Sequence, residues 1–359
     1  MNIAFFGSSL LSAYWNGAAT YYRGIIRALH AHGHRVTFYE PIAWDRPQHR
    51  DIEPPEWCEV VVYPGTEAEA HRHLDMARGA DMIVKASGVG LFDDLLEAGV
   101  LALKNERNLV VFWDVDAPVT LDRMEGDPAD PFRACVPGYD FILTYGGGQP
   151  VVRGYEAFGA KAVFPIYNAL DPETHHPVAP DARFEADLGL LANRLPDREA
   201  RVEEFFLGPA AGLPESRFLL GGNGWQDKNV SPNVRYLGHV YTADHNAFNC
   251  TARAVLNICR ASMARYGFSP PTRVFEACGA GACLLTDAWE GVEQFFEPGA
   301  EVLVAHDGAE VAEHVRSLTP ARARAIGERA YRRALADHTY TQRARQVEEV
   351  LAGHAPAPR

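Results

Sequence analysis

Apolar and polar positions along the first half of the chain follow two alternating periods. Short, almost uniformly apolar runs predict strands at 2–6, 35–39, 59–63, 82–85, 109–113, 141–144 and 162–166. Between several of them, apolar residues recur at helical spacing, which predicts helices at 21–29, 67–78, 91–103 and 151–158. Uniformly apolar strands that alternate with amphipathic helices are typical of a parallel sheet covered on both faces. We therefore expect a doubly wound α/β first domain.

The same alternation begins again after an aperiodic, proline-rich segment. The second set of predicted strands is 188–191, 217–220, 234–237, 255–259, 283–286 and 302–304. Helices are expected near 198–207, 271–279 and 309–317, and the Arg-, Ala- and Glu-rich stretch from 320 to 353 predicts one or two long terminal helices.

These patterns divide the chain into two similar domains. We expect a Rossmann-like domain at 1–167, a linker at 168–182, a second Rossmann-like domain at 183–338, and a terminal helix and tail at 339–359. Ligands of open parallel sheets bind beyond the carboxyl ends of the strands, so we expect the two domains to face each other across a ligand-binding cleft.

Composition and charge exclude several classes of protein. The chain has 359 residues, 47% hydrophobic and 23% charged, which indicates a folded protein. The 34 Lys and Arg against 47 Asp and Glu give a net charge of −13, which disfavours proteins that bind nucleic acid or anionic membranes by neutralising phosphates. No apolar run is long enough for a transmembrane segment and no secretory signal is present, so we expect a cytoplasmic protein. Neither the cysteines nor His30, His32 and His34 have the spacing of a metal site.

The most informative stretch for function is YGFSPPTRVFEACGAGACLLTD at 266–287. Pro270 and Pro271 suit a loop that enters a helix, whose first free amides bind an anion such as a diphosphate. Arg273 can add a charge-assisted contact, and Glu276 is placed to accept hydrogen bonds from a pair of hydroxyls, such as those of a ribose. The alternative is a buried structural helix with a carboxylate favoured by the helix dipole.

Two further loops favour a ligand over that alternative. In LLGGNGW, at 219–225, a strand runs into a glycine-rich loop where a ligand can approach the backbone of Gly222 and Asn223. In NVRYLGHVY, at 233–241, a strand ends at Gly238, and the backbone groups beside it can read the edge of a base.

These motifs carry a resemblance to a known family. The sequences LLGGNGW, NVRYLGHV, SPPTRVFEACGAGACLLTD and FFEPGAEVLV, in this order, resemble the nucleotide-sugar-binding half of group 1 glycosyltransferases of GT-B architecture, in particular the CgeB-like (spore maturation protein) branch. The resemblance covers about residues 185–350. The first half is similar in pattern through GSSLLSAYWNGAATYYRGIIRALHAHGHRVTFYE, and NALDPETHHP resembles the crossover between the two domains of the family.

The resemblance implies a donor site in the second domain. Glu276 would bind the ribose of a nucleoside diphosphate sugar, and the amides around Thr272 and Arg273 would hold the diphosphate. Gly238 would line the base pocket together with its two successors, His239 and Val240. Lys228 would reach a phosphate, although a solvated surface lysine explains it equally well.

The first domain would then be the acceptor side. The loop at 7–17 would close the cleft through Gly7, Ser8, Asn16 and Gly17, and Asn16 would either cap the first helix or touch the ligand.

One departure from the family pattern concerns the stereochemistry of the reaction. Retaining members of the wider group carry a second Glu eight positions before the first, and here that position is Phe268. The resemblance therefore does not imply that this chain retains the configuration of the transferred sugar.

A second candidate constellation is the acidic pair of VVFWDVDAP at 110–118. Asp114 and Asp116 follow an apolar strand, where either carboxylate could deprotonate an acceptor hydroxyl, with a slight preference for Asp114. The pair is also a literal DxD, which in single-domain glycosyltransferases holds a divalent metal on the donor diphosphate, but two tandem α/β halves do not fit that architecture. A structural turn and cap is the third interpretation.

The expected function is transfer of a sugar from a nucleoside diphosphate sugar to an unknown acceptor: a glycan, a small molecule or a protein. No cofactor, no metal ion and no nucleic-acid partner are expected. The alternatives are a non-catalytic nucleotide-sugar-binding protein, which the Phe268 departure permits, and a nucleotide-sugar epimerase of the same fold.

Overall fold

The computed structural model describes residues 1–14, 16–88 and 90–354 and divides into two compact units. Unit 1 comprises Met1–Asn168 and Tyr340–Arg359, and unit 2 comprises Ala169–Thr339. The last five residues of the predicted tail lie outside the described residues. In the part of the chain that is described, no helix combines the length and the apolar character needed to cross a membrane.

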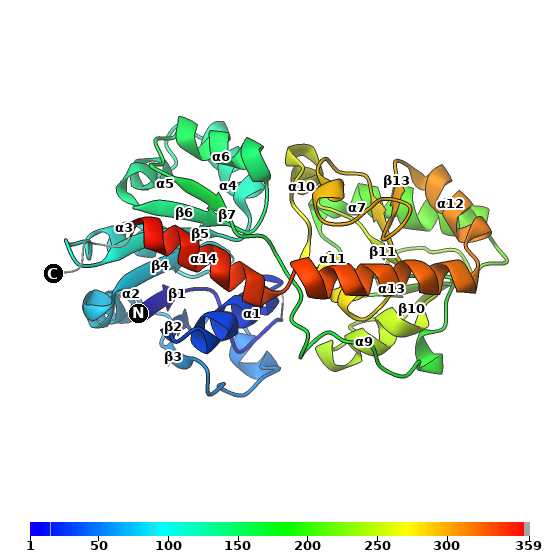
Figure 1. The fold of residues 1–359 in the computed structure, drawn as a ribbon, viewed down its shortest axis with the longest axis horizontal. Coiled ribbons are helices and arrows are strands. Elements are labelled where there is room, and N and C mark those ends of the chain that lie inside the picture. The colour runs from blue at the N-terminus through cyan, green and yellow to red at the C-terminus, as the bar shows by residue number, and fades with distance from the viewer. Residues whose placement is uncertain (15, 89, 355–359) are drawn as a thin grey trace. The chain divides into compact units, whose positions relative to one another are not determined.

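Each unit is built on one parallel sheet with helices on both sides (Figure 1), which confirms the predicted α/β class. The sheet of unit 1 has the strand order β3-β2-β1-β4-β5-β6-β7, and that of unit 2 has the order β10-β9-β8-β11-β12-β13. The strands of unit 1 are β1 (Asn2–Phe6), β2 (Arg35–Pro41), β3 (Glu59–Tyr63), β4 (Met82–Ala86), β5 (Leu109–Asp114), β6 (Phe141–Thr144) and β7 (Val163–Pro165). The strands of unit 2 are β8 (Leu188–Leu191), β9 (Phe218–Gly221), β10 (Val234–Tyr236), β11 (Val255–Asn257), β12 (Leu284–Asp287) and β13 (Leu303–Ala305).

The helices connect successive strands and cover the sheets. Unit 1 contains α1 (Ala18–Ala31), α2 (Glu67–Met76), α3 (Asp93–Leu101), α4 (Ala117–Gly126), α5 (Phe132–Cys135), α6 (Gly148–Ala157) and α14 (Tyr340–His354). Unit 2 contains α7 (Pro196–Val202), the π-helical turn η5 (Glu203–Leu207), α8 (Gly208–Gly212), α9 (Thr242–Thr251), α10 (Ala261–Tyr266), α11 (Thr272–Gly279), α12 (Gly308–Ser317) and α13 (Pro320–Asp337).

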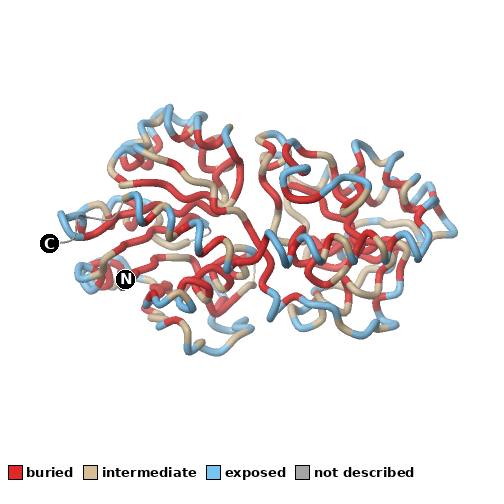
Figure 2. Tube along the Cα trace, viewed as in Figure 1, coloured by how far each residue is buried: buried red, intermediate tan, exposed pale blue. Residues whose placement is uncertain are grey.

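Burial follows the apolar runs that predicted the strands, and Figure 2 shows buried segments along the strands of both units. In unit 2, Leu188 and Leu190 of β8 pack in one cluster while Leu191 packs in another. Successive side chains of a strand point to opposite faces, so both faces of this sheet are apolar and covered.

The core of unit 1 contains buried aromatic side chains whose polar atoms have partners. The Phe5 ring stacks on Phe38 with centroids 5.3 Å apart. The Trp113 indole donates to the Tyr21 hydroxyl at 2.9 Å, and that hydroxyl donates to the Ile166 carbonyl at 2.8 Å. A buried Tyr or Trp is stable when its polar tip is hydrogen-bonded, so this chain of bonds fixes α1 against the sheet.

The terminal helix α14 packs on α1 and belongs to unit 1, not to the unit that precedes it in sequence. Gly24 of α1 makes room for the Tyr340 ring, since any side chain there would overlap it. Glu348 of α14 accepts from His32 at 2.7 Å and lies 3.3 Å from His34, so two of the three closely spaced histidines pair with this carboxylate.

Candidate functional site

The strand order of unit 2 reverses between β8 and β11, which marks the expected position of a ligand at the carboxyl ends of these strands. The glycine-rich loop after β9 packs onto the loop after β8. Gly222 has a φ of 123°, and a side chain there would overlap the Ala192 carbonyl. The amide of Asn223 donates to the side chain of Asn193 at 2.9 Å. Both predicted donor-binding residues therefore shape this edge of the sheet.

The segment after β10 carries the three residues predicted to line a base pocket. Gly238 has a φ of 72°, and its carbonyl accepts from the Gly222 amide at 2.7 Å. His239 is exposed and lies 3.3 Å from the Asn223 amide nitrogen, and Val240 is buried. The structure brings these residues next to the glycine-rich loop, and their contact with a base stays a prediction.

Helix α11 begins where the sequence predicted. Its N-cap is Pro271, which has no side-chain hydrogen bond to the helix, so the amides of Thr272 and Arg273 lie in an uncapped first turn. Such amides carry the positive end of the helix dipole and bind anions. Phe268 lies in the loop before Pro271 and has a φ of 47°. This left-handed conformation costs a non-glycine residue about 1 kcal/mol or more. The departure from the family pattern thus coincides with a strained turn.

Most basic side chains near this helix are already paired. Arg201 contacts the buried Asp287 at 2.6 Å, and Arg260 contacts Asp197 at 2.6 Å. Lys228, the residue predicted to reach a phosphate, contacts Glu199 at 2.8 Å and also Glu203. Two carboxylates therefore neutralise Lys228, and this geometry favours a structural role for it.

Arg198 and Arg273 differ from these paired residues. Within the described part of the chain, neither guanidinium has a hydrogen bond or an ion pair with a carboxylate, and the Nε of Arg198 is buried without a partner. Burial lowers the pKa of Arg273 to about 10, the nearby Glu276 carboxylate partly offsets this lowering, and the charge of Arg198 adds a smaller lowering, so Arg273 stays protonated at neutral pH. Two half-buried arginines without a carboxylate partner near the first turn of α11 are therefore candidates for binding a dianion. Sequence reasoning missed Arg198, because only the fold brings α7 to α11.

Glu276 lies one turn further along α11. The residue is only 8% exposed, and its carboxylate makes no hydrogen bond with any described residue. The His175 ring lies beside it, with 4.0 Å between Nε2 and Glu276 Oε1. The carboxylate is therefore available to accept hydrogen bonds from a ligand, which agrees with the predicted role in binding hydroxyls.

A second histidine, His245 of α9, approaches the same carboxylate. Ligand atoms of His175, His245 and Glu276 all lie within 4.8 Å of one another. Burial lowers the pKa of His245 to about 4, so its ring is neutral at pH 7, and Nε2 lies 3.2 Å from the Val240 carbonyl. Neither histidine was singled out from the sequence, because the two are distant from Glu276 along the chain.

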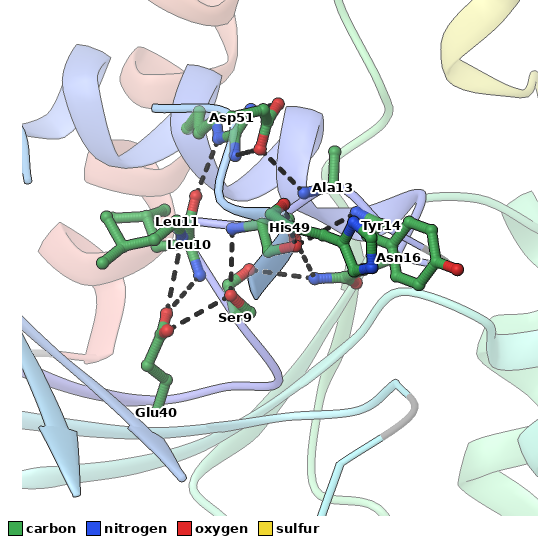
Figure 3. A network of polar contacts seen from close by, with 11 residues as sticks. Ser9, Leu10, Leu11, Ala13, Tyr14, Asn16, Glu40, His49 and Asp51 are labelled. Carbon is green, nitrogen blue, oxygen red and sulfur yellow. Dashed lines mark hydrogen bonds and ion pairs between the residues drawn. The ribbon is translucent and has the colours of Figure 1, made fainter. Parts of the chain in front are cut away.

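The predicted cleft loop of unit 1 is held by a polar network (Figure 3). Glu40 at the end of β2 accepts from the Leu10 amide at 2.6 Å and from the Ser9 hydroxyl at 3.2 Å. The Asn16 side chain donates to the Ser9 carbonyl at 3.0 Å and accepts from Ser8 at 3.1 Å.

Asn16 therefore stabilises the loop through hydrogen bonds within it. It does not cap α1, because the N-cap residue of that helix is Gly17. Gly7 is required by packing, because a side chain there would overlap the Phe38 ring. The network fixes the loop after β1, at the point where the strand order of unit 1 also reverses.

The acidic pair lies at the carboxyl end of β5, as predicted, but its two members have different surroundings. Asp114 is fully buried, accepts from Ser87 Oγ at 2.6 Å and from the Asp116 amide at 2.8 Å, and also bonds the Tyr155 hydroxyl. Asp116 is partly exposed and is the N-cap residue of α4. These contacts favour a structural role for Asp114 and leave Asp116 as the candidate base, against the slight preference that sequence position gave.

Comparisons with known proteins bear on the family and the fold of this chain. Residues 198–349 match a family model described as glycosyl transferase-like. Similar solved structures include sucrose-phosphate synthase from Thermosynechococcus elongatus, with a TM-score of 0.72 and 15% identity over 98% of both chains. HepE from Anabaena in complex with UDP and glucose gives a TM-score of 0.69 and 14% identity over 98% of this chain and 100% of that one.

A third similar structure is an α-glucosyltransferase in complex with UDP and a 13-mer DNA. Its TM-score is 0.72 at 12% identity, over 98% of this chain and 99% of that one. No curated protein sequence matches the chain significantly. At such low identity the structural likeness establishes the fold, so the predicted GT-B class is confirmed.

Proposed function

We propose that this protein is a glycosyltransferase that uses a nucleoside diphosphate sugar as its donor. The observation that carries the proposal is the group of unpaired charges on α7 and α11. Arg198, Arg273 and the first turn of α11 offer positive charge for a diphosphate, and Glu276 offers acceptor oxygens for ribose hydroxyls. The glycosyl transferase-like match over 198–349 covers all of these residues and supports the proposal.

The donor is further proposed to be a uridine nucleotide sugar. HepE and the α-glucosyltransferase were both determined with UDP, and this chain shares their fold over nearly its whole length. We also propose membership of the CgeB-like branch, which the resemblance of the sequence motifs supports, and an acceptor that is a glycan, a small molecule or a protein.

We propose that the transfer itself requires no cofactor and no metal ion. The leaving group of the reaction is a diphosphate, whose developing negative charge must be stabilised. Two guanidiniums and a helix N-terminus supply that stabilisation in the proposed site, which is the function that a divalent metal has in other transferases. Asp116 is the proposed base that takes the proton of the acceptor hydroxyl.

A thermal-shift screen of nucleoside diphosphates tests the donor proposal. Binding to the folded state alone stabilises a protein by about 2.7 kcal/mol at 100 times the dissociation constant, which raises the melting temperature measurably. We expect a shift with UDP and none with the matched nucleoside uridine at the same concentration. A screen in which UDP, GDP, ADP, TDP and CDP all leave the melting temperature unchanged would contradict the proposal.

A further inference from the structure

The two histidines beside Glu276 have no function in the donor site proposed above. They come from different parts of unit 2: His175 lies in the segment before β8, and His245 lies in the first turns of α9. Their positions are set by surrounding contacts. Asp171 holds the turn that carries His175, with the His175 amide 2.8 Å from its carbonyl, and Asn246 donates to the Thr174 carbonyl at 2.9 Å, which ties α9 to that turn.

Two of the three side chains in this cluster make no hydrogen bond with a described residue. His175 is 2% exposed, and its ring has no such bond. The Glu276 carboxylate has none either. Both side chains are therefore available to bind a ligand that lies between them.

The hydrogen bond of His245 indicates what that ligand is. Nε2 lies 3.2 Å from the Val240 carbonyl, so this nitrogen carries the proton and Nδ1 keeps its lone pair. A histidine that binds a metal commonly donates its other ring N–H to a backbone carbonyl, which fixes the tautomer in the same way.

We infer that His175, His245 and Glu276 form a binding site for a transition-metal ion of the Zn²⁺ type. Two imidazoles and one carboxylate are a ligand set that zinc uses with a fourth position left open, whereas Mg²⁺ and Ca²⁺ select oxygen ligands. Tetrahedral zinc places its ligand atoms roughly 3.4 Å apart. The present separations of at most 4.8 Å thus require a closure of about 1.4 Å or less, which side-chain torsions supply.

The site has a consequence for donor binding, and this consequence rests on the proposed function. Glu276 is the proposed acceptor for the ribose hydroxyls, and the same carboxylate is a metal ligand. Bound zinc therefore competes with the nucleoside diphosphate, and the metal acts as an inhibitor rather than as a participant in the transfer.

Metal binding is tested on the full chain after treatment with a chelator. Calorimetry with Zn²⁺ and titration with Co²⁺, followed by its visible absorption, should both show one tight equivalent per chain. His175→Ala and His245→Gln should each weaken it at least about tenfold, since loss of mere supporting contacts around a metal already costs 10- to 100-fold. His176→Ala is the matched control, because its ring is exposed and lies next in sequence to His175. Far-UV circular dichroism checks that each variant is folded.

Unchanged binding in both histidine variants, an equal loss in His176→Ala, or no tight equivalent in the unmodified chain would overturn the site. The competition is measured separately, as the affinity for UDP with and without zinc. We expect zinc to weaken UDP binding at least tenfold in the unmodified chain and to have no effect in His245→Gln relative to its own metal-free value. Zinc binding without any UDP binding would refute the proposed function and leave the metal site standing, while equal UDP affinity with and without zinc would overturn the competition.

Discussion

At the residue scale, the basic side chains on which the proposal rests are those without a carboxylate partner. Arg201 and Arg260 have carboxylate partners at 2.6 Å, and Lys228 has two carboxylates, while Arg198 and Arg273 have no such partner among the described residues. The sequence indicated both Arg273 and Lys228 as possible contacts of a phosphate. Which of them is neutralised depends on carboxylates brought by other elements, and a single sequence does not contain that information.

The two unpaired arginines should each contribute a charge-assisted contact to the diphosphate. Replacing either Arg198 or Arg273 by Ala should weaken UDP binding by about 1.5–3 kcal/mol, or about 10- to 150-fold. Arg217→Ala removes the same charge from an exposed pair with Glu185 and should leave the affinity unchanged. Isothermal calorimetry measures all three variants. Equal affinities for uridine diphosphate in the unmodified chain and in both site variants would show that the diphosphate is held elsewhere.

The acidic pair makes a second prediction at this scale. A general base contributes about 10² to 10⁴ in rate, so Asp116→Asn should lower turnover by that order with donor affinity nearly unchanged. Asp114→Asn should instead lower the melting temperature, because its oxygens are internal acceptors for Ser87, Tyr155 and the Asp116 amide. Addition of a chelator should not lower the turnover of the unmodified enzyme. Activity that vanishes with chelator and returns with Mg²⁺ or Mn²⁺ would contradict the metal-free transfer.

At the element scale, the strands were predictable and several helices were not. Every strand of both sheets lies at an apolar run identified in the sequence, because a strand buried on both faces needs such a run. The helices α4, α5, α8, α9 and α10 were missed. Helix α9 has the sequence TADHNAFNCT, whose few apolar positions give no clear stripe, and its helical form depends on packing against the rest of unit 2.

A buried acid on α3 gives a pH-dependent prediction for that element. Glu97 is 4% exposed with Oε2 unpartnered, and burial raises its pKa from 4.5 to about 7. The folded chain therefore binds this proton more tightly than the unfolded chain. The resulting stabilisation is complete below about pH 4.5 and is lost as the pH rises through about 7, and the loss amounts to about 3 kcal/mol.

The unfolding free energy in urea at pH 5 and pH 8 tests this effect. Glu97→Gln should remove the part of the pH dependence of the unfolding free energy that Glu97 causes, and it should stabilise the protein at pH 8. Glu125→Gln, at an exposed position of α4, is the control and should change neither value. A pH dependence that is identical in Glu97→Gln and the unmodified chain would mean that Glu97 ionises normally in the folded state.

At the scale of the whole molecule, the sequence predicted two α/β domains and a terminal helix, but not the unit on which that helix packs. Residues 339–359 were expected to follow the second domain as a terminal helix and tail. Instead α14 joins unit 1, where Arg343 donates to the Tyr167 carbonyl at 3.1 Å and Glu348 pairs with His32. Helical periodicity shows that a face is apolar, but it does not specify the surface on which that face packs.

The segment at 168–182 was predicted to be a linker between the two domains. From Ala169 on it belongs to unit 2, where the Val178 amide lies 3.3 Å from Cys250 Sγ and the Asp181 amide donates to Thr251 at 2.9 Å. These contacts bring His175 to Glu276. The candidate metal ligands therefore follow from the path of the segment, which its proline content and lack of periodicity did not reveal.

The central claim is that unit 2 binds the nucleotide part of a sugar donor through Glu276, and one measurement tests it most directly. Calorimetric titration of UDP into the unmodified chain and into Glu276→Ala, both free of metal, compares the two affinities. If the carboxylate accepts ribose hydroxyls, its removal should weaken binding by about 1.5–3 kcal/mol, or about 10- to 150-fold, with the fold intact by circular dichroism. Unaltered affinity in a Glu276→Ala variant of reduced stability would contradict the account and make Glu276 a structural residue of α11.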